Sequence, residues 1–179
     1  MVRIVLTEKG LEDRFAILEA QTRQAESPYY AVNPSGRVPY LERSEGQGLE
    51  DSRLIIEYLD GLRPPTQFAG DFEVRRLESV ARSMLDGVAV WARESRRPEA
   101  EQSPTIVAHE RARAARLADF WDGEVAHPLM QEGFNLAQLT LIVTLQLEGR
   151  FGFEWREGHS RLAVWVDRLA KRPSIAANP

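Results

Sequence analysis

The sequence predicts an α/β N-terminal domain over residues 1–62 and an all-helical C-terminal domain, an all-α bundle, over residues 63–179. In the first part, short apolar runs alternate with turns that contain Gly and Pro, which is typical of strands and short helices. In the second part, apolar residues recur at helical spacing over long stretches. Between the two parts, the paired prolines of Leu62–Gln67 favour a stiff linker, because proline stops helices.

The N-terminal part is predicted to begin with a short helix over Val2–Leu11, which ends at Gly10 because glycine readily adopts the left-handed conformation after a helix. The alternating, β-forming run Phe15–Glu19 is expected to be a strand. A second strand is expected over Val38–Arg43, and a very short third strand is expected around Leu49. This order gives a small sheet preceded by a helix.

From Asp51 onward the apolar spacing becomes helical, so a helix is expected to begin there. Phe72–Arg97 is predicted to be a long amphipathic helix, and Ser103 is expected to cap a second long helix through about residue 125. Asn135 is expected to cap a third, strongly apolar helix, and Ser160 is expected to cap a fourth. Four helices of this kind make an all-helical domain.

The composition argues against several classes of function. The net charge is −4, and arginines alternate with glutamates, so we expect no nucleic-acid partner. The chain has no cysteine, and His109, His127 and His159 are scattered, so no metal site is expected. The most apolar window, Leu136–Leu147, is too short to span a membrane. The absence of cysteine and of a signal peptide after Met1 favours a cytoplasmic protein.

Several short motifs occur in an order that resembles the glutathione S-transferase family of bacteria. They are Glu8–Gly10, Asn33–Leu41, Asp51–Leu59, Asn135–Gln138, Leu162–Trp165 and Arg172–Ser174. The resemblance covers nearly the whole sequence. It implies a thioredoxin-like N-terminal domain that binds glutathione, followed by an all-helical C-terminal domain.

The resemblance also implies which residues bind glutathione. The peptide bond between Val38 and Pro39 is expected to be cis, so that the main chain of Val38 pairs with the cysteinyl unit of the tripeptide like an added strand. Ser52 is expected at the start of a helix, where its hydroxyl and amide bind the γ-glutamyl carboxylate. Asp51 is expected to meet the ammonium group of the ligand. The predicted glutathione site is therefore Val38, Pro39, Asp51 and Ser52.

A pocket for a second, small hydrophobic substrate is also implied by the resemblance, and Trp91, Phe120 and Trp121 are its candidate lining residues. The alternative is that these aromatic residues belong to the helical core, which is the commoner role for aromatic side chains at helical spacing.

Compared with the family, the sequence is expected to begin one strand late. Relatives place a Ser, Tyr or Cys at the end of the first strand, where it stabilises the glutathione thiolate, and no residue here matches it. Ser27, Tyr29 and Tyr30 carry hydroxyls but lie in the wrong segment. A mis-assigned start or trimmed chain, a partner segment and a degenerate protein remain three alternative explanations. No catalytic residue is therefore assigned.

Two functions are consistent with these features. The first is a glutathione transferase, a detoxification enzyme that transfers the thiolate of its co-substrate glutathione to an electrophilic small molecule, or that reduces a disulfide or peroxide. The second is a non-catalytic glutathione-binding or scaffold protein with a degenerate transferase fold. The resemblance implies a homodimer in either case.

Overall fold

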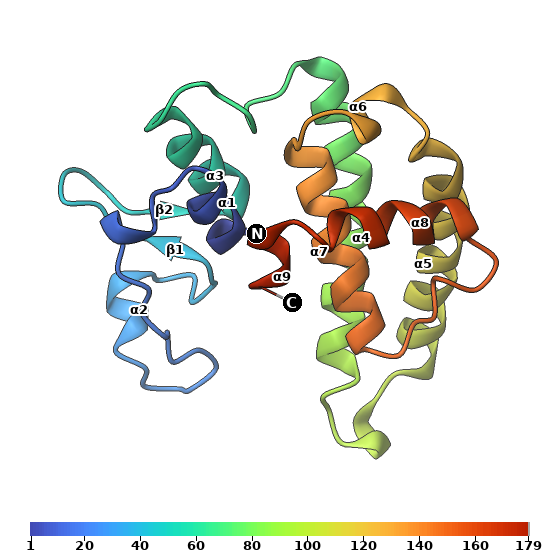
Figure 1. Ribbon diagram of the computed structural model, residues 1–179. Coiled ribbons are helices and arrows are strands. Elements are labelled where there is room, and N and C mark those ends of the chain that lie inside the picture. Colours follow the sequence, from blue (N-terminus) through green and yellow to red (C-terminus); the bar gives the residue numbers. More distant parts are fainter. Residues whose placement is uncertain (179) are drawn as a thin grey trace. The chain divides into compact units, whose positions relative to one another are not determined.

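A computed structural model of the protein describes residues 1–178, and it divides the chain into two compact units (Figure 1). The first unit comprises Met1–Phe68 together with Asn178, and the second comprises Ala69–Ala177.

The first unit combines three helices with a small antiparallel sheet. Its elements are α1 (Val2–Glu8), a 3-10 turn (Glu12–Arg14), α2 (Tyr29–Val32), β1 (Tyr40–Leu41), β2 (Leu49–Glu50) and α3 (Ser52–Gly61). In the sheet, Tyr40 lies opposite Glu50 and Leu41 lies opposite Leu49. The predicted first helix, the short strand at Leu49 and the helix after Asp51 are confirmed.

The predicted strand over Val38–Arg43 is shorter than expected, since only Tyr40–Leu41 pairs with a neighbour. Pro39 has no N–H to donate to a ladder. At the other end, the Arg43 side chain turns back and its Nε donates to the main-chain oxygen of Gln47 at 2.7 Å. The loop between the strands therefore begins soon after Leu41.

The predicted strand over Phe15–Glu19 is wrong. No residue of this segment belongs to a strand, and the apolar side chain of Leu18 is 79% exposed. Side chains that alternate between two faces indicate a segment that can join a sheet. A strand also needs a neighbouring strand with which to form main-chain hydrogen bonds. Among residues 1–178 the sheet contains only β1 and β2, so this segment has no ladder partner.

The core of the first unit forms where α1 packs against α3. The fully or almost fully buried apolar side chains of this core are Ile4, Val5, Leu6, Leu11, Ile55, Ile56, Leu59 and Phe68. Burial of one apolar stripe from each helix holds α3 in place, and α3 carries the candidate binding residues at its N-terminus.

A buried ion pair joins α1, α3 and the segment that follows α3. Lys9 Nζ lies 2.8 Å from Asp60 Oδ1, and both side chains are almost fully buried. The Asp60 carboxylate also accepts hydrogen bonds from the main-chain amides of Gln67 and Phe68, and Lys9 donates to the Pro65 oxygen. These bonds tie the expected linker to the first unit, which extends to Phe68.

The second unit is entirely helical among its described residues. Its elements are α4 (Phe72–Glu94), a 3-10 turn (Glu99–Glu101), α5 (Pro104–Glu124), α6 (Pro128–Gln131), α7 (Leu136–Arg150), α8 (Ser160–Leu169) and α9 (Pro173–Ala176). Within this unit α4 lies alongside both α5 and α7, and α8 packs on α5 (Figure 1). Most of α7 is buried, which agrees with its apolar sequence. None of the helices in residues 1–178 has the length and apolarity that crossing a membrane requires.

The predicted caps of this unit are confirmed at two helices and wrong at a third. Ser103 and Asn135 accept hydrogen bonds from amides in the first turns of α5 and α7. Ser160 is instead the first residue of α8, and the cap position belongs to His159, whose side chain makes no capping bond. Asp122 of α5 accepts from the Leu162 amide at 2.9 Å and so caps α8 from a neighbouring helix.

Glu148, near the end of α7, is a buried carboxylic acid. Its side chain is buried, and its Oε2 atom has no hydrogen-bond partner among residues 1–178. Burial disfavours the charged carboxylate and raises the pKa of Glu148 to about 8.

Replacement of Asp60 by Asn tests the buried ion pair. The Asp60→Asn variant leaves the Lys9 ammonium buried without its counter-charge, so we expect a loss of about 3–5 kcal/mol in the free energy of unfolding, measured with urea. Glu73→Gln is the matched control, since it breaks the exposed pair with Arg76 and should cost less than about 1 kcal/mol. Equal losses in the two variants would contradict a structural role for the buried pair.

Replacement of Glu148 by Gln tests the raised pKa. Because the folded-state pKa lies above the unfolded value, the cost of ionising Glu148 is absent below about pH 4.5 and complete above about pH 8. The stability of the wild type relative to Glu148→Gln should therefore fall by about 1.4 kcal/mol per pH unit within this window. Urea unfolding of both proteins from pH 5 to 8 measures this difference. A constant difference would show that Glu148 titrates normally.

Candidate functional site

Among residues 1–178, the main chain of Val38 is an unpaired polar edge on the surface of the first unit. The peptide bond between Val38 and Pro39 is cis, as predicted, and Val38 is 59% exposed. Neither the N–H nor the carbonyl of Val38 makes a hydrogen bond among residues 1–178. An exposed residue with both groups unpaired can add a peptide strand from outside.

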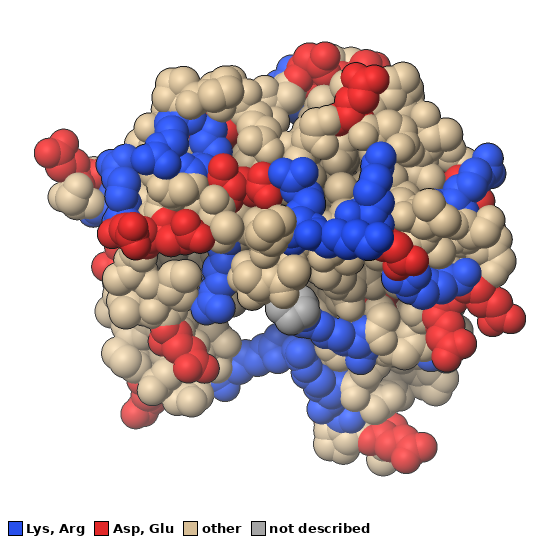
Figure 2. All heavy atoms as spheres, in the orientation of Figure 1, with Lys and Arg blue, Asp and Glu red and all other residues tan. Residues whose placement is uncertain are grey.

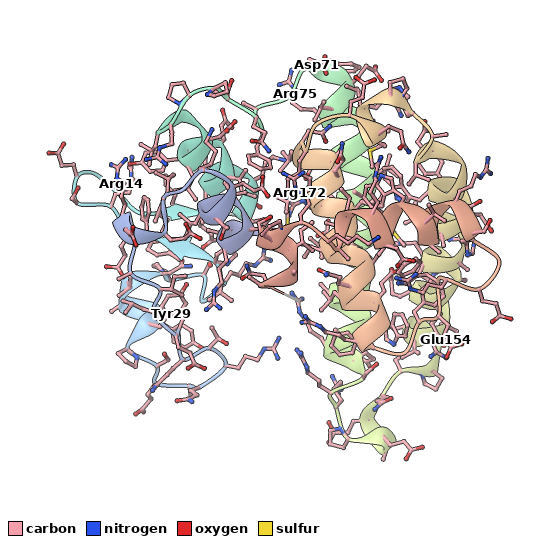
Figure 3. The ribbon with its side chains drawn as sticks, viewed as in Figure 1. Arg14, Tyr29, Asp71, Arg75, Glu154 and Arg172 are labelled. Carbon is pink, nitrogen blue, oxygen red and sulfur yellow. The ribbon has the colours of Figure 1, made fainter. Side chains whose placement is uncertain are left out.

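The loop before Val38 is held by side chains from α2 and the turn after it. The Tyr29 hydroxyl (labelled in Figure 3) and the Asn33 amide both donate to the main-chain oxygen of Arg37. Gly36 has a φ of +65°, and a Cβ at that position would lie 2.6 Å from the Tyr30 ring. The turn therefore requires glycine, and the main chain just before Val38 is fixed.

Asp51 and Ser52 form the start of α3. Asp51 has a φ of +74° and a ψ of 124°, a conformation that residues other than glycine rarely adopt. Its Oδ1 accepts a hydrogen bond from the Arg53 amide at 2.7 Å and so caps the helix. Ser52 is the first residue of α3, as predicted, at the positive end of the helix dipole. Strained backbone of this kind is often found at binding sites.

The short sheet brings these two segments to the same end of a hairpin. Tyr40 pairs with Glu50, so Pro39 and Asp51 directly flank that pair on neighbouring strands. The Ser35 hydroxyl also donates to the Glu50 carboxylate, which ties the loop before Val38 to β2. The four predicted residues therefore belong to two adjoining segments.

The structure also shows residues at this site that the sequence analysis did not select. Hydrogen bonds from Ser35 and Asn33 lower the pKa of Glu50, so its carboxylate stays charged. Arg37 is exposed and immediately precedes Val38, and its charge contributes to the same lowering. The position of Arg37 directly before the Val-Pro step was the signal that could have identified it.

The expectation that Trp91 and Trp121 line a second-substrate pocket needs correction. Their exposed fractions are 2% and 0%, so these side chains belong to the helical core and offer almost no surface to a substrate. Trp91 packs edge-on against Phe153, with ring centroids 6.0 Å apart. Phe120 is partly exposed and lies edge-on to Trp121. Of the three aromatic candidates, only Phe120 has accessible surface of any size.

Other candidate groups at this site serve the fold. The Ser27 hydroxyl donates to the Gln21 main-chain oxygen, and the Tyr29 hydroxyl is used by the loop described above. Among residues 1–178, His, Asp and Glu side chains form no group of three or more that could hold a metal ion. The arrangement offers main-chain donors and acceptors, a helix N-terminus and carboxylates, which suit a charged peptide.

Comparison with known proteins identifies a family model and several relatives that this chain resembles. The family described as "Glutathione S-transferase, N-terminal domain" matches residues 1–62. The uncharacterized GST-like protein YibF of Escherichia coli K12 is 28% identical over 97% of this chain and 89% of its own length. Glutathione S-transferase 2 of Saccharomyces cerevisiae is 25% identical over 97% of this chain and 82% of its own length.

Solved structures show the same fold. A glutathione transferase family member from Pseudomonas fluorescens Pf-5, with bound S-(propanoic acid)-glutathione, has a TM-score of 0.85 and 27% identity over 98% of this chain and 90% of its own. A glutathione S-transferase from Methylobacillus flagellatus KT, with glutathione bound, has a TM-score of 0.85 and 28% identity over 98% of this chain and 91% of its own. Residues 1–62 thus match the N-terminal domain of glutathione S-transferases, and structures of glutathione transferases share the fold over nearly the whole chain.

Substitutions at Asp51 separate its capping role from its backbone strain. Asp51→Ala loses the cap and keeps the unfavourable positive φ, so it should lower the free energy of unfolding by about 1–2 kcal/mol. Asp51→Gly loses the cap but relieves the strain, so it should cost only a few tenths of a kcal/mol, roughly, or nothing. Urea unfolding measures both. Equal costs would mean that the positive φ carries no strain.

Proposed function

We propose that the protein binds glutathione at Val38, Pro39, Asp51 and Ser52 and transfers its thiolate to a small hydrophobic electrophile, or uses it to reduce a disulfide or peroxide. The observation that carries this proposal is the exposed, unpaired main chain of Val38, which lies at the same end of the hairpin as the N-terminus of α3.

The cysteinyl and γ-glutamyl units of glutathione both have matching groups at this site. The cysteinyl unit pairs with the N–H and carbonyl of Val38, so recognition uses the main chain and tolerates a small apolar side chain. We assign the γ-glutamyl carboxylate to the N-terminus of α3, where the Ser52 amide and hydroxyl lie at the positive end of the helix dipole. The Asp51 carboxylate attracts the ligand ammonium. Relatives of known structure with glutathione bound support glutathione as the ligand.

In the proposed reaction the glutathione sulfur reacts as a thiolate. In conjugation it forms a C–S bond with an electrophilic carbon. The displaced electron pair leaves with the halide of an aryl halide, moves to the ring oxygen of an epoxide, or moves to the carbonyl oxygen of an enone, and in the last two cases the oxygen anion or enolate then takes a proton from water. In disulfide reduction it attacks one sulfur, forms a mixed disulfide and releases a thiolate, and a second glutathione completes the exchange. The four binding residues orient the tripeptide for either step, and we assign no residue as the donor to the sulfur.

The expected partners and location are part of the same proposal. The homodimer and the cytoplasmic location remain predictions, as does the partly exposed Phe120 as a contact for the electrophile. Neither nucleic acid nor a membrane surface is part of the proposal.

Glutathione binding is tested with the Ser52→Ala variant. Removal of the hydroxyl should weaken glutathione binding by about tenfold or more, as measured by isothermal titration, since a hydrogen bond to a charged group is lost. Val38→Leu should bind within about threefold of the wild type, because the main chain makes the contact. Ser79→Ala, which removes an exposed hydroxyl of α4, is the matched control. Binding that Ser52→Ala leaves unchanged would move the site elsewhere.

Catalysis is tested separately on the same proteins. Wild-type protein with saturating glutathione should conjugate at least one class among aryl halides, epoxides and enones, or reduce a hydroperoxide or disulfide, and Ser52→Ala should lower kcat/KM. Binding without turnover across this panel would contradict the transferase reaction and favour the non-catalytic alternative.

A further inference from the structure

A hollow of about 500 Å³ lies on the second unit, where α8, α6 and the end of α5 meet. Arg161, Val164, Trp165 and Arg168 contribute to its lining. These residues are three, four and seven positions apart, so one face of α8 forms a wall of the hollow. All of the lining residues belong to the second unit, and none is part of the candidate glutathione site.

Part of the apolar surface of the hollow is exposed to solvent. Val164 is 70% exposed although it is an apolar residue. Ala126, which follows α5 and is exposed, contributes further apolar surface to the lining. The Trp165 ring is buried and fixed, since its Nε1 donates to the Met130 oxygen at 2.6 Å. A ligand with an apolar body would remove this surface from water.

Arg168, at the edge of the hollow, is held by hydrogen bonds to neutral groups, and no carboxylate among residues 1–178 neutralises its charge. Arg168 donates to the main-chain oxygens of Met130 and Gln131 and to Oε1 of Gln131, which are all neutral acceptors. No carboxylate among residues 1–178 forms an ion pair with it. By contrast, Arg161 pairs with Asp122, and the neighbouring Asp167 pairs with Arg156.

The guanidinium of Arg168 therefore has donors left for a ligand. At most three of the five N–H groups of an arginine are used by the contacts above. Figure 2 shows that Lys and Arg side chains gather over the end of α8 and the turn into α9, where Arg172 is labelled in Figure 3. This surface attracts anions, and a fixed guanidinium binds a carboxylate with two parallel hydrogen bonds.

We propose that the hollow binds a small amphipathic carboxylate, whose apolar body packs on Val164 and Ala126 and whose carboxylate accepts hydrogen bonds from Arg168. The volume lies in the range of sites for small organic ligands. The proposal is independent of glutathione binding, because the two sites share no residue.

The experiment uses 2-naphthoate as the probe and isothermal titration of the full chain as the measurement. The wild type should bind 2-naphthoate at one site, and neutral 2-naphthamide, which has nearly the same shape, should bind about tenfold more weakly or worse. Arg168→Gln should weaken 2-naphthoate by about tenfold, and Arg168→Lys should recover part of the loss because it keeps the charge.

A second variant is needed because Arg168 also binds the main-chain oxygens at the end of α6, so that its replacement could lower the stability of the fold. Val164→Asp changes an exposed side chain and places a negative charge in the wall, so it should also weaken 2-naphthoate by about tenfold. Arg97→Gln, which removes an exposed arginine paired with Glu101, should leave binding within about twofold.

Three outcomes would overturn the proposal. They are the absence of saturable binding to the wild type, equal binding of the acid and the amide, and binding that Arg168→Gln and Val164→Asp leave unchanged. If glutathione displaces 2-naphthoate while these variants bind it normally, the probe occupies the glutathione site and the proposal also fails.

Discussion

The pairing of β1 with β2 is the constraint on which the candidate site depends. Only two residues of each strand pair, with Tyr40 opposite Glu50 and Leu41 opposite Leu49. This register places the segment that ends at Pro39 beside the segment that begins at Asp51. A shift of one residue would turn every side chain of the strand to the other face and separate the Val38 main chain from the start of α3. A very short ladder thus defines where a ligand could be bound.

So short a sheet needs support from its surroundings, and the helices provide it. Burial of α3 against α1 fixes the end of β2, and the Asp60 carboxylate joins α1, α3 and the segment up to Phe68. On the other side, Tyr29 and Asn33 hold the Arg37 carbonyl, so the main chain enters β1 in one conformation. The candidate site is therefore built mostly from backbone, which the surrounding side chains hold in position.

Much of this arrangement could be predicted from the sequence, because the residues that begin or end helices give strong local signals. Gly10, Ser103 and Asn135 mark helix ends through their own side chains or backbone freedom, and the predicted helices follow. The errors concern partners distant in sequence. Phe15–Glu19 alternates like a strand but has no neighbour to pair with, and α8 is capped by Asp122 from another helix instead of by Ser160. The burial of Trp91 and Trp121 likewise depends on how helices pack, which periodicity does not reveal.

The central claim is that glutathione pairs with the main chain of Val38, and amide hydrogen exchange at this residue tests it most directly. The Val38 N–H is exposed and unpaired in the ligand-free protein, so it should exchange rapidly with solvent. Saturating glutathione should slow that exchange by at least about tenfold, because the N–H then donates to the cysteinyl unit. An exchange rate at Val38 that saturating glutathione leaves unchanged would contradict the account.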